Sequence, residues 1–517
     1  MKGVFMKKHT RILAGLLVCF LAAGMISCSS GGTNEETAAS DTAGQISAEP
    51  SAEPVEIPEE PKGNGRSEVK DSLPDTLDFE GVDVRVFSRG GDKDTLMEFS
   101  AEEMNGDVVN DAVFTRNLAV QERLNVVMDL ILDTGLNRHS GAGNTIRASI
   151  TAGSDDYDLI GNAMYNTMPL VVDNMFLPLN TLPYLDFSAP WYNQAFLETT
   201  NLNGNNYVIM GELSQTMISG TFSMFFNKTL FDEYYNGSEN LYDIVNEGEW
   251  TLDKMAALCE PLYTDTNGDG AANEGDTFGH FFTDTKTLGA DSFFGAAQIE
   301  YLAKTDDGTF VFNGTSERMV EFAEKMHKLL FQNNNTLRTP NNNDQIMDIM
   351  KNHQAVFTTW MLGGIDYLRD MEDDFGIIPM PKLNEAQEIY TSYIHDGSSA
   401  FTIPVTAQKT DVTAAYLEAM SAESYRTVTP AYFETAIKSK YSRDSETSQM
   451  LDLIVSGVYL DYSYIYGQSL GAPIDVIRGI LADATSCENS QSKLKGLEKA
   501  TLKMFDKVVE KYQDLLN

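Results

Sequence analysis

The residues VDVRV at positions 82–86 open the stretch that decides the fold. Their three valines alternate with charged residues, as in a strand with one buried face. Two further strand-like runs follow, NVVMDLIL at 125–132 and YDLIGNA at 157–163. Helical patterns over 109–124 and 145–152 separate the three runs. Strands that alternate with helices in this way predict βαβ units and a parallel sheet.

A second set of the same kind follows further along the chain. A strand-like run at 222–227 precedes helical patterns at 251–262 and 319–330, and a short strand over 354–359 ends directly at Trp360. About 440 residues beyond the N-terminal region suit two domains rather than one. The sequence therefore predicts an α/β protein in which the βαβ pattern occurs twice.

Residues 1–27 have the pattern of a secretory signal peptide. Four cationic side chains precede the apolar run 12–24, and Cys28 follows small residues. The apolar run of about 13 residues is too short to span a bilayer of about 30 Å. Cys28 resembles the acceptor of a bacterial lipobox, whose thiol takes a diacylglyceryl group. We therefore expect a lipidated Cys28, with plain secretion or an uncleaved anchor as the alternatives.

Residues 28–76 are rich in Ser, Gly, Thr, Glu, Ala and Pro and contain very few large apolar side chains. Such a segment cannot bury enough surface to offset its ordering entropy, so we expect a disordered linker after the lipidated cysteine. Its typical reach is roughly 35–40 Å. A folded body on this linker would stay close to the membrane.

The acidic excess of the chain excludes nucleic acid as a partner. The sequence has 37 Lys and Arg against 76 Asp and Glu, a net charge of −39. Removing residues 1–28 takes away four cationic side chains and no acidic ones, which leaves 33 against 76, or −43. So acidic a chain repels phosphate backbones.

Beyond residue 28 the sequence contains two cysteines, Cys259 and Cys487. The sequence does not decide whether they form a disulfide or stay as two reduced, buried thiols.

A series of short motifs runs through residues 77–517. They are NGD at 105–107, NDAV at 110–113, PWYN at 190–193, GE at 211–212, FFNK at 225–228, GEWT at 248–251 and FGIIPMP at 375–381. Their order and spacing resemble the extracellular solute-binding lipoproteins of bacterial ABC importers. The resemblance is to the sugar-binding branch, which is similar to maltose-binding protein.

This resemblance implies a two-lobed periplasmic-binding-protein-like fold of type II, with the ligand in the cleft between two α/β lobes. Lobe one would comprise 77–206 and 341–390, and lobe two 207–340 and 391–517. The family also implies a monomer, lipid-anchored at the extracytoplasmic face of the cell membrane, that delivers a carbohydrate to ABC permease subunits. The doubled βαβ pattern agrees, and open parallel sheets bind ligands at the carboxyl ends of their strands.

Six residues are candidate ligand contacts. Flat aromatic faces pack on sugar rings, while carboxylates accept hydrogen bonds from sugar hydroxyls. We predict ring contacts from Trp360, Trp191 and Tyr192, each with a core position as its alternative. The predicted crossing segments supply Glu212, Asp396 and Tyr393 as polar contacts, with a structural role as the alternative.

The third tryptophan, Trp250, is expected to be structural. It precedes a candidate helix N-cap at Thr251, and Met255 lies four residues beyond that cap. This is the spacing of a hydrophobic staple, in which the residue before the cap packs on one in the first turns of the helix.

The run DTNGDGAANEGD at 265–276 matches a calcium-binding loop of the EF-hand type. The predicted ligands are Asp265, Asn267, Asp269, the carbonyl of Ala271, Asn273 and Asp276. Aspartate at the last place resembles the dockerin form of the loop. Only one flanking helix is expected, because 277–282 has the pattern of a strand. Any calcium would therefore be structural, and an acidic turn without metal is the alternative.

Catalysis is poorly supported by the sequence, in which the S-x-x-K matches at 67–70 and 492–495 fall in the expected linker and on a predicted helix. The sequence contains no G-x-S-x-G elbow, H-E-x-x-H pair or C-x-x-C. His395 and Asp396 have no second histidine nearby, which favours a polar turn over an acid/base centre. We therefore expect a binding protein and no catalytic cofactor. The alternatives are a surface glycoside hydrolase or lyase, an adhesin or scaffold, and a binding protein for an amino acid, peptide or polyol.

Overall fold

The computed structural model describes residues 65–90, 97–133, 141–202, 204–283, 289–305, 310–332, 334–339, 346–441 and 444–514. The expected signal peptide, Cys28 and the expected linker up to residue 64 lie outside these ranges.

The end of the expected linker, residues 65–76, is folded, which corrects the prediction of disorder there. Leu73 is 5% exposed within a hydrophobic core. Asp71 forms ion pairs with Arg123 at 2.7 Å and with Arg426 at 3.1 Å. Composition does not reveal these partners, because they lie 52 and 355 residues away in the sequence.

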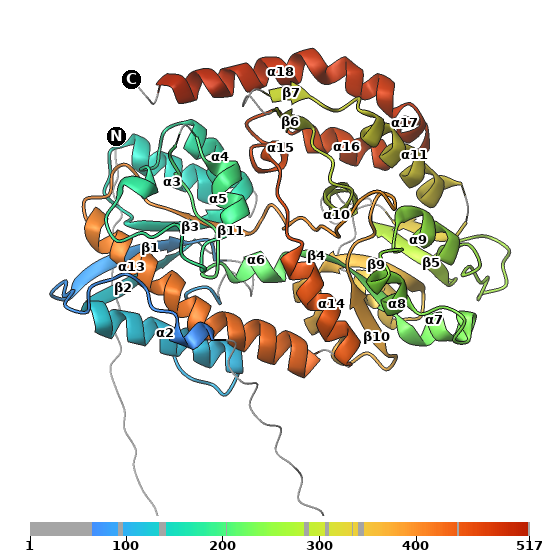
Figure 1. Ribbon diagram of the computed structural model, residues 1–517, viewed down its shortest axis with the longest axis horizontal. Coiled ribbons are helices and arrows are strands. Elements are labelled where there is room, and N and C mark those ends of the chain that lie inside the picture. Colours follow the sequence, from blue (N-terminus) through green and yellow to red (C-terminus); the bar gives the residue numbers. More distant parts are fainter. Residues whose placement is uncertain are drawn as a thin grey trace, which may run out of the picture. The chain divides into compact units, whose positions relative to one another are not determined.

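The first sheet, called sheet one below, has the strand order β11-β3-β1-β2 (Figure 1). Its strands are β1 (Val82–Ser88), β2 (Val126–Leu132), β3 (Leu159–Ala163) and β11 (Ser399–Thr402). Strand β1 runs parallel to β2 and β3, while β11 pairs with β3 in the antiparallel sense. Helices α2 (Val108–Leu124) and α3 (Gly141–Thr151) connect the parallel strands. The predicted βαβ units are confirmed.

The second sheet, called sheet two below, has the order β10-β4-β9-β5-β8. Its strands are β4 (Phe222–Asn227), β5 (Phe278–Thr283), β8 (Thr336–Thr339), β9 (Ala355–Met361) and β10 (Phe375–Ile378). Strand β5 is parallel to β8 and β9, and β4 is antiparallel to β9 and β10. Every residue of β4 and β5 is buried, as expected for strands covered on both faces.

Sheet membership corrects the expected division of the chain. The prediction placed 341–390 in lobe one and 391–517 in lobe two. Strands β9 and β10, which lie in the first of these ranges, pair with β4 in sheet two. Strand β11, which opens the second range, pairs with β3 in sheet one. A strand pattern shows that a segment needs a partner but does not say which strand provides it.

Helices cover both sheets and extend to the C-terminus (Figure 1). Those between β3 and β9 are α4 (Met164–Val172), η2 (Leu179–Thr181), α5 (Gln194–Thr200), α6 (Gln215–Ser219), α7 (Lys228–Tyr235), α8 (Leu241–Asn246), α9 (Leu252–Cys259), α10 (Ala290–Ala296), α11 (Glu317–Phe331) and α12 (Ile346–Lys351). Later helices are η4 (Leu362–Leu368), α13 (Thr410–Glu423), α14 (Ser445–Ser456), α15 (Tyr462–Ile465), α16 (Pro473–Leu481), α17 (Ala484–Glu488) and α18 (Ser490–Asp514). The short η1 (Arg66–Glu68) precedes β1, and a small ladder pairs β6 (Leu302–Lys304) with β7 (Phe310–Phe312).

One long helical segment shares core contacts with both sheets. It starts as α13 and continues in π-helical turns, η5 (Ser424–Val428) and η6 (Pro430–Tyr441). Tyr416 and Leu417 of α13 belong to a core with Val84 of β1. Phe433 and Ile437 of η6 belong to a core with Phe225 of β4 and Ile377 of β10. The segment therefore spans the junction of the two sheets on one side.

Candidate functional site

Two segments connect the sheets, and backbone hydrogen bonds hold them side by side. The first leads from sheet one to β4, and the second returns from β10 to β11. The Phe222 N–H donates to the Tyr393 carbonyl at 3.0 Å, and the His395 N–H donates to the Gly220 carbonyl at 2.8 Å. The returning segment thus forms an isolated antiparallel bridge, Thr221 with Ile394, just before β4, at the edge where the parallel strands of sheet two end.

The ends of parallel strands in sheet one meet the same returning segment. Arg89 directly follows β1, and its guanidinium donates to the Gly397 carbonyl at 2.9 Å. Tyr165, in the first turn after β3, donates its N–H to the Asp396 carbonyl at 3.0 Å. The carboxyl ends of parallel strands from both sheets therefore converge on residues 393–398. Ligands of open α/β sheets bind at such ends, so we take this junction as the candidate site.

A cluster of charged side chains lies at the junction. The Arg478 guanidinium of α16 makes two hydrogen bonds to the buried Asp291 carboxylate of α10, with Nε 2.8 Å from Oδ1. Its Nη1 donates to Asp475 at 2.8 Å, and its Nη2 lies 3.7 Å from an Asp396 oxygen. The Tyr464 hydroxyl lies 3.4 Å from Asp291. Helices α10 and α16 and the returning segment thus meet around one arginine.

Burial and charge pairing oppose each other in this cluster. Burial raises the pKa of Asp291 to about 7, against the lowering effect of Arg478. Burial works to lower the pKa of Arg478, but the charge of Asp291, its hydrogen bond to Arg478 and the charge of Asp396 together hold that pKa above its ordinary value. The side chains are 0% and 9% exposed, so neither charge is well solvated without the other.

Of the predicted ligand contacts, Asp396 belongs to this cluster, and the centroid of the Tyr393 ring lies 4.4 Å from that of Tyr464, which belongs to it as well. The Asp396 side chain is 16% exposed. Tyr393 is fully buried, and its hydroxyl donates to Asp461, which caps α15. Burial raises the pKa of Asp461 to about 6. Tyr393 is therefore committed to an internal bond.

Trp360 is half-buried near the end of β9. Its carbonyl accepts a hydrogen bond from Ser223 of β4 at 3.4 Å. Gly364 packs on its ring so closely that a Cβ there would lie 1.9 Å from the indole Cδ1. Its predicted contact with a ligand stays a prediction.

The remaining predicted contacts, Trp191, Tyr192 and Glu212, lie elsewhere. Trp191 and Tyr192 are 2% and 3% exposed, and Tyr192 bonds the Glu418 carboxylate of α13. Glu212 pairs with Arg66 of η1 at 3.2 Å, and burial raises the pKa of its carboxyl. Burial argues against ligand contact by the two rings, because their faces already contact core side chains. The PWYN motif therefore places Trp191 and Tyr192 in the hydrophobic core that packs on sheet one.

The predicted calcium loop is a closed turn. The backbones of Thr264 and Thr277 bond each other at 2.9 and 3.1 Å across its base, and β5 follows directly, as predicted. Inside, the carboxylate of Asp265 accepts from the N–H groups of Gly268 and Gly270, at 2.7 and 3.0 Å.

The other predicted calcium ligands also bond within the loop. Asn267 and Asp269 each accept from a backbone N–H two residues on, and Asp276 accepts from Thr266 at 3.1 Å. The Asn273 amide donates to the Ala271 carbonyl at 2.9 Å. Among the described residues, no group of three or more His, Cys, Asp or Glu is arranged to hold a metal ion. Calcium binding stays a prediction.

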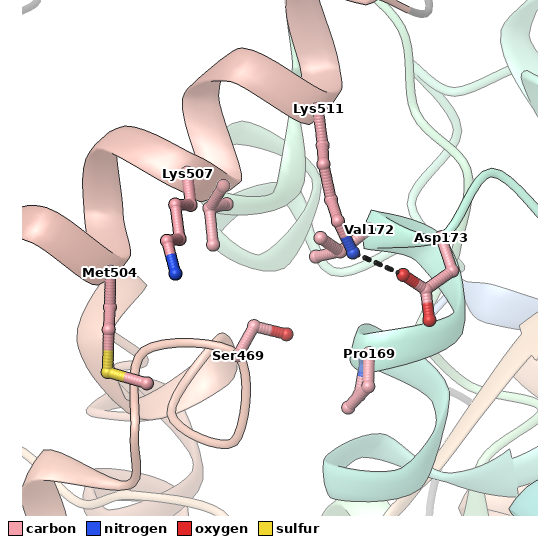
Figure 2. A pocket seen from close by; sticks show the side chains of 8 residues that line it. Pro169, Val172, Asp173, Ser469, Met504, Lys507 and Lys511 are labelled. Atoms are coloured by element: carbon pink, nitrogen blue, oxygen red, sulfur yellow. Dashed lines mark hydrogen bonds and ion pairs between the residues drawn. The ribbon is translucent and has the colours of Figure 1, made fainter.

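A groove lies between α4 and α18 (Figure 2). Lys507 and Lys511 of α18 face Pro169 and Asp173 of α4 across it, and Lys511 Nζ lies 2.6 Å from an Asp173 oxygen. Its volume is about 260 Å³. This is below the roughly 300–1,000 Å³ of ordinary ligand pockets, so the groove by itself does not accommodate an oligosaccharide.

The sequence-based prediction missed Asp291 and Arg478. Each is a charged residue within a mostly apolar or small helix, ADSFFGA at 290–296 and PIDVIRGIL at 473–481. Charges in such helices are rarely buried unless paired. That pattern was the available signal, but it does not say that the two side chains are each other's partners.

Several solved structures are similar to this protein in fold. The GacH receptor of Streptomyces glaucescens, solved with acarbose, is 12% identical, with 83% of this chain and 99% of that chain covered and a TM-score of 0.54. The cyclic α-maltosyl-1,6-maltose binding protein of Arthrobacter globiformis is 14% identical, with 82% and 99% covered and a TM-score of 0.55. UgpB of Mycobacterium tuberculosis, in complex with glycerophosphocholine, is 14% identical, with 81% and 98% covered and a TM-score of 0.51.

This chain has the type II substrate-binding fold. No family model matches the sequence, and no curated protein matches it. At such low identities the likeness concerns the fold alone. In the type II substrate-binding fold, two α/β lobes are joined by crossing segments, and the junction at residues 393–398 is such a crossing. No helix in the described part of the chain is both long and apolar enough to cross a membrane.

Proposed function

We propose that this chain is the substrate-binding component of a bacterial ABC importer. It captures a sugar or oligosaccharide between its two lobes and delivers it to the permease. The observation that carries the proposal is the convergence of strand ends from both sheets on one crossing segment, in a fold that solved sugar-binding proteins share. A site built from both sheets changes shape when the sheets move, which suits an open state without ligand and a closed state with it.

The fold alone does not determine the ligand. The GacH receptor was solved with acarbose, and the Arthrobacter protein is a cyclic α-maltosyl-1,6-maltose binding protein, whereas UgpB was solved with glycerophosphocholine. Micromolar capture requires only about −8 kcal/mol, which a few ring contacts and hydrogen bonds provide after the cost of closure. The lack of a G-x-S-x-G, H-E-x-x-H or C-x-x-C motif in the sequence supports binding rather than hydrolysis.

A thermal-shift screen against neutral glycans tests the proposal. A glycan at 100 times its dissociation constant adds about 2.7 kcal/mol to the free energy of unfolding. We expect at least one neutral oligosaccharide to raise the melting temperature without being cleaved. If no glycan raises it, sugar capture is wrong, and if the glycan is cleaved, the protein is a glycoside hydrolase or lyase.

The proposed site of action is the extracytoplasmic face of the cell membrane, where the lipid on Cys28 holds a monomeric body near the permease. The signal-like residues 1–27 and the cysteine that follows them support this placement. Metabolic labelling with a fatty-acid analogue tests it. We expect label on the wild-type chain and none on Cys28→Ala, which should appear in the medium. Equal labelling of both chains would contradict lipidation at this residue.

A further inference from the structure

We propose that Asp396 and Arg478 bind hydroxyl groups of a neutral sugar and that the charges around them exclude anionic ligands. The inference rests on the proposed function, because it names ligand contacts and a ligand class for the same junction. Four observations carry it: the backbone bonds of the crossing segment, the unused acceptors of Asp396, the unused donors of Arg478, and the net charge of the cluster.

The crossing segment is held in place without the Asp396 carboxylate. The N–H of His395 donates to Gly220, and the Asp396 carbonyl accepts from Tyr165, at 2.8 and 3.0 Å. The Arg89 side chain donates to the next carbonyl, at 2.9 Å. These bonds attach the backbone to both sheets. The carboxylate is therefore available for another role.

The acceptors of Asp396 are unused. Its oxygens lie 3.6 Å from His395 Nδ1 and 3.7 Å from Arg478 Nη2, beyond the usual 2.7–3.2 Å of a hydrogen bond. No residue in the described ranges donates a hydrogen bond to this carboxylate. A carboxylate with a 16% exposed side chain ordinarily accepts several, so its lone pairs call for a donor from outside the protein.

His395 does not provide that donor. Its Nδ1 accepts a hydrogen bond from the Gly397 N–H at 2.9 Å, which assigns the ring proton to Nε2. The nitrogen nearest Asp396 therefore presents a lone pair and donates no hydrogen bond to the carboxylate.

Arg478 supplies donors beside those unused acceptors. A guanidinium has five N–H bonds, and Nε, Nη2 and Nη1 each use one on Asp291 or Asp475. One N–H on each terminal nitrogen is left. Asp291 fixes the plane of the group by a two-point contact, so Asp291 is a positioning residue. A sugar hydroxyl both donates and accepts, and it can bridge Asp396 and Arg478.

The net charge of the cluster selects against anions. The carboxylates of Asp396 and Asp475 and the guanidinium of Arg478 sum to −1, and the sum becomes −2 when Asp291, whose pKa burial raises to about 7, is ionised as well. A phosphate or carboxylate on the ligand would enter at close range to this like charge in a poorly solvated site. A neutral polyhydroxylated ligand avoids the repulsion and uses the same hydrogen bonds.

The test compares Asp396→Asn and Asp396→Ser with wild type by isothermal titration. The probes are the neutral oligosaccharide found in the thermal-shift screen and its analogue oxidised to a uronic acid. Asp370→Asn is the matched control, because it removes one carboxylate from an exposed pair with Lys351. We expect the two Asp396 variants to bind the neutral probe about 10- to 100-fold more weakly, as for a lost hydrogen bond to a charged group. Their preference for the neutral probe over the acidic one should also shrink.

The outcomes separate the two proposals. Equal binding of the neutral probe by wild type and both Asp396 variants, with unchanged melting temperatures, overturns the assignment of Asp396 but leaves sugar capture intact. Tighter binding of the uronic acid than of the neutral probe by wild type overturns the charge selection. Failure of every neutral glycan to bind wild type overturns the proposed function as well.

Discussion

Glu98 provides a sharp test of the electrostatics beside the junction. Its side chain is fully buried, and Thr216 donates a hydroxyl hydrogen bond to one carboxylate oxygen at 2.9 Å. Burial raises the pKa of Glu98 from 4.5 to about 7. Because the folded-state pKa lies above the ordinary one, the folded protein binds more protons than the unfolded chain between these values. The stability contributed by this group is therefore present at low pH and lost as pH rises through about 7.

The gap between the two pKa values corresponds to about 3 kcal/mol. In Glu98→Gln the side chain is always neutral, so this pH-dependent penalty disappears. Arg116 donates to the main-chain carbonyl of Glu98, a bond that the substitution keeps. We expect the free energy of unfolding of the variant, relative to wild type, to increase by about 3 kcal/mol between pH 4 and pH 8.

Urea unfolding followed by tryptophan fluorescence at a series of pH values measures this difference. Subtracting wild type from variant removes the contributions of other buried carboxyls, which both chains share. Glu122→Gln on the exposed face of α2 is the control and should show no such trend. A difference between Glu98→Gln and wild type that does not change with pH would refute the reasoning.

Three further predictions concern packing, metal and thiols. Trp250→Phe should lower the free energy of unfolding by about 2 kcal/mol in urea titrations, because it leaves a void and removes the indole hydrogen bond to the Pro379 carbonyl; no change would contradict this account. Excess Ca²⁺ over EGTA should raise the melting temperature of wild type but not of Asp265→Ala if the loop binds calcium, and equal melting in both conditions would show that it does not. In a chain without residues 1–28, a thiol reagent should label neither Cys259 nor Cys487 before urea is added and both afterwards, because both are free and buried and burial raises their pKa values; labelling in the folded state would contradict their placement.

Local patterns predicted most of the elements well. The run at 125–132 is β2, that at 157–163 contains β3, and the strand expected at 354–359 is β9, with Trp360 just before its end. These segments alternate or are continuously apolar because their own faces are buried, so the information is in the segment itself. The structural role of Trp250 was also predicted from its own segment. Trp250 is fully buried, and Thr251 caps α9 as predicted.

Pairing between distant segments was not predictable in this way. The sequence indicated neither that β9 and β10 join β4 nor that Asp71 meets Arg426. The candidate site also depends on contacts between segments that are distant in the sequence. Asp396 was a candidate because it lies in an expected crossing segment. Asp291 and Arg478 could be recognised as site residues only once the structure showed that their side chains pair with each other.

By itself, the sequence determined the α/β class, the doubled βαβ pattern and the positions of most helices and strands. Each follows from side chains within one segment, where periodicity and composition act over a few residues. The tertiary structure alone decided sheet membership, the burial of Trp191 and Tyr192, and the meeting of Asp396 with Arg478. The physical reason is that burial and charge pairing depend on distances in space, and residues up to 308 positions apart in this chain form single hydrogen-bonded pairs at the junction.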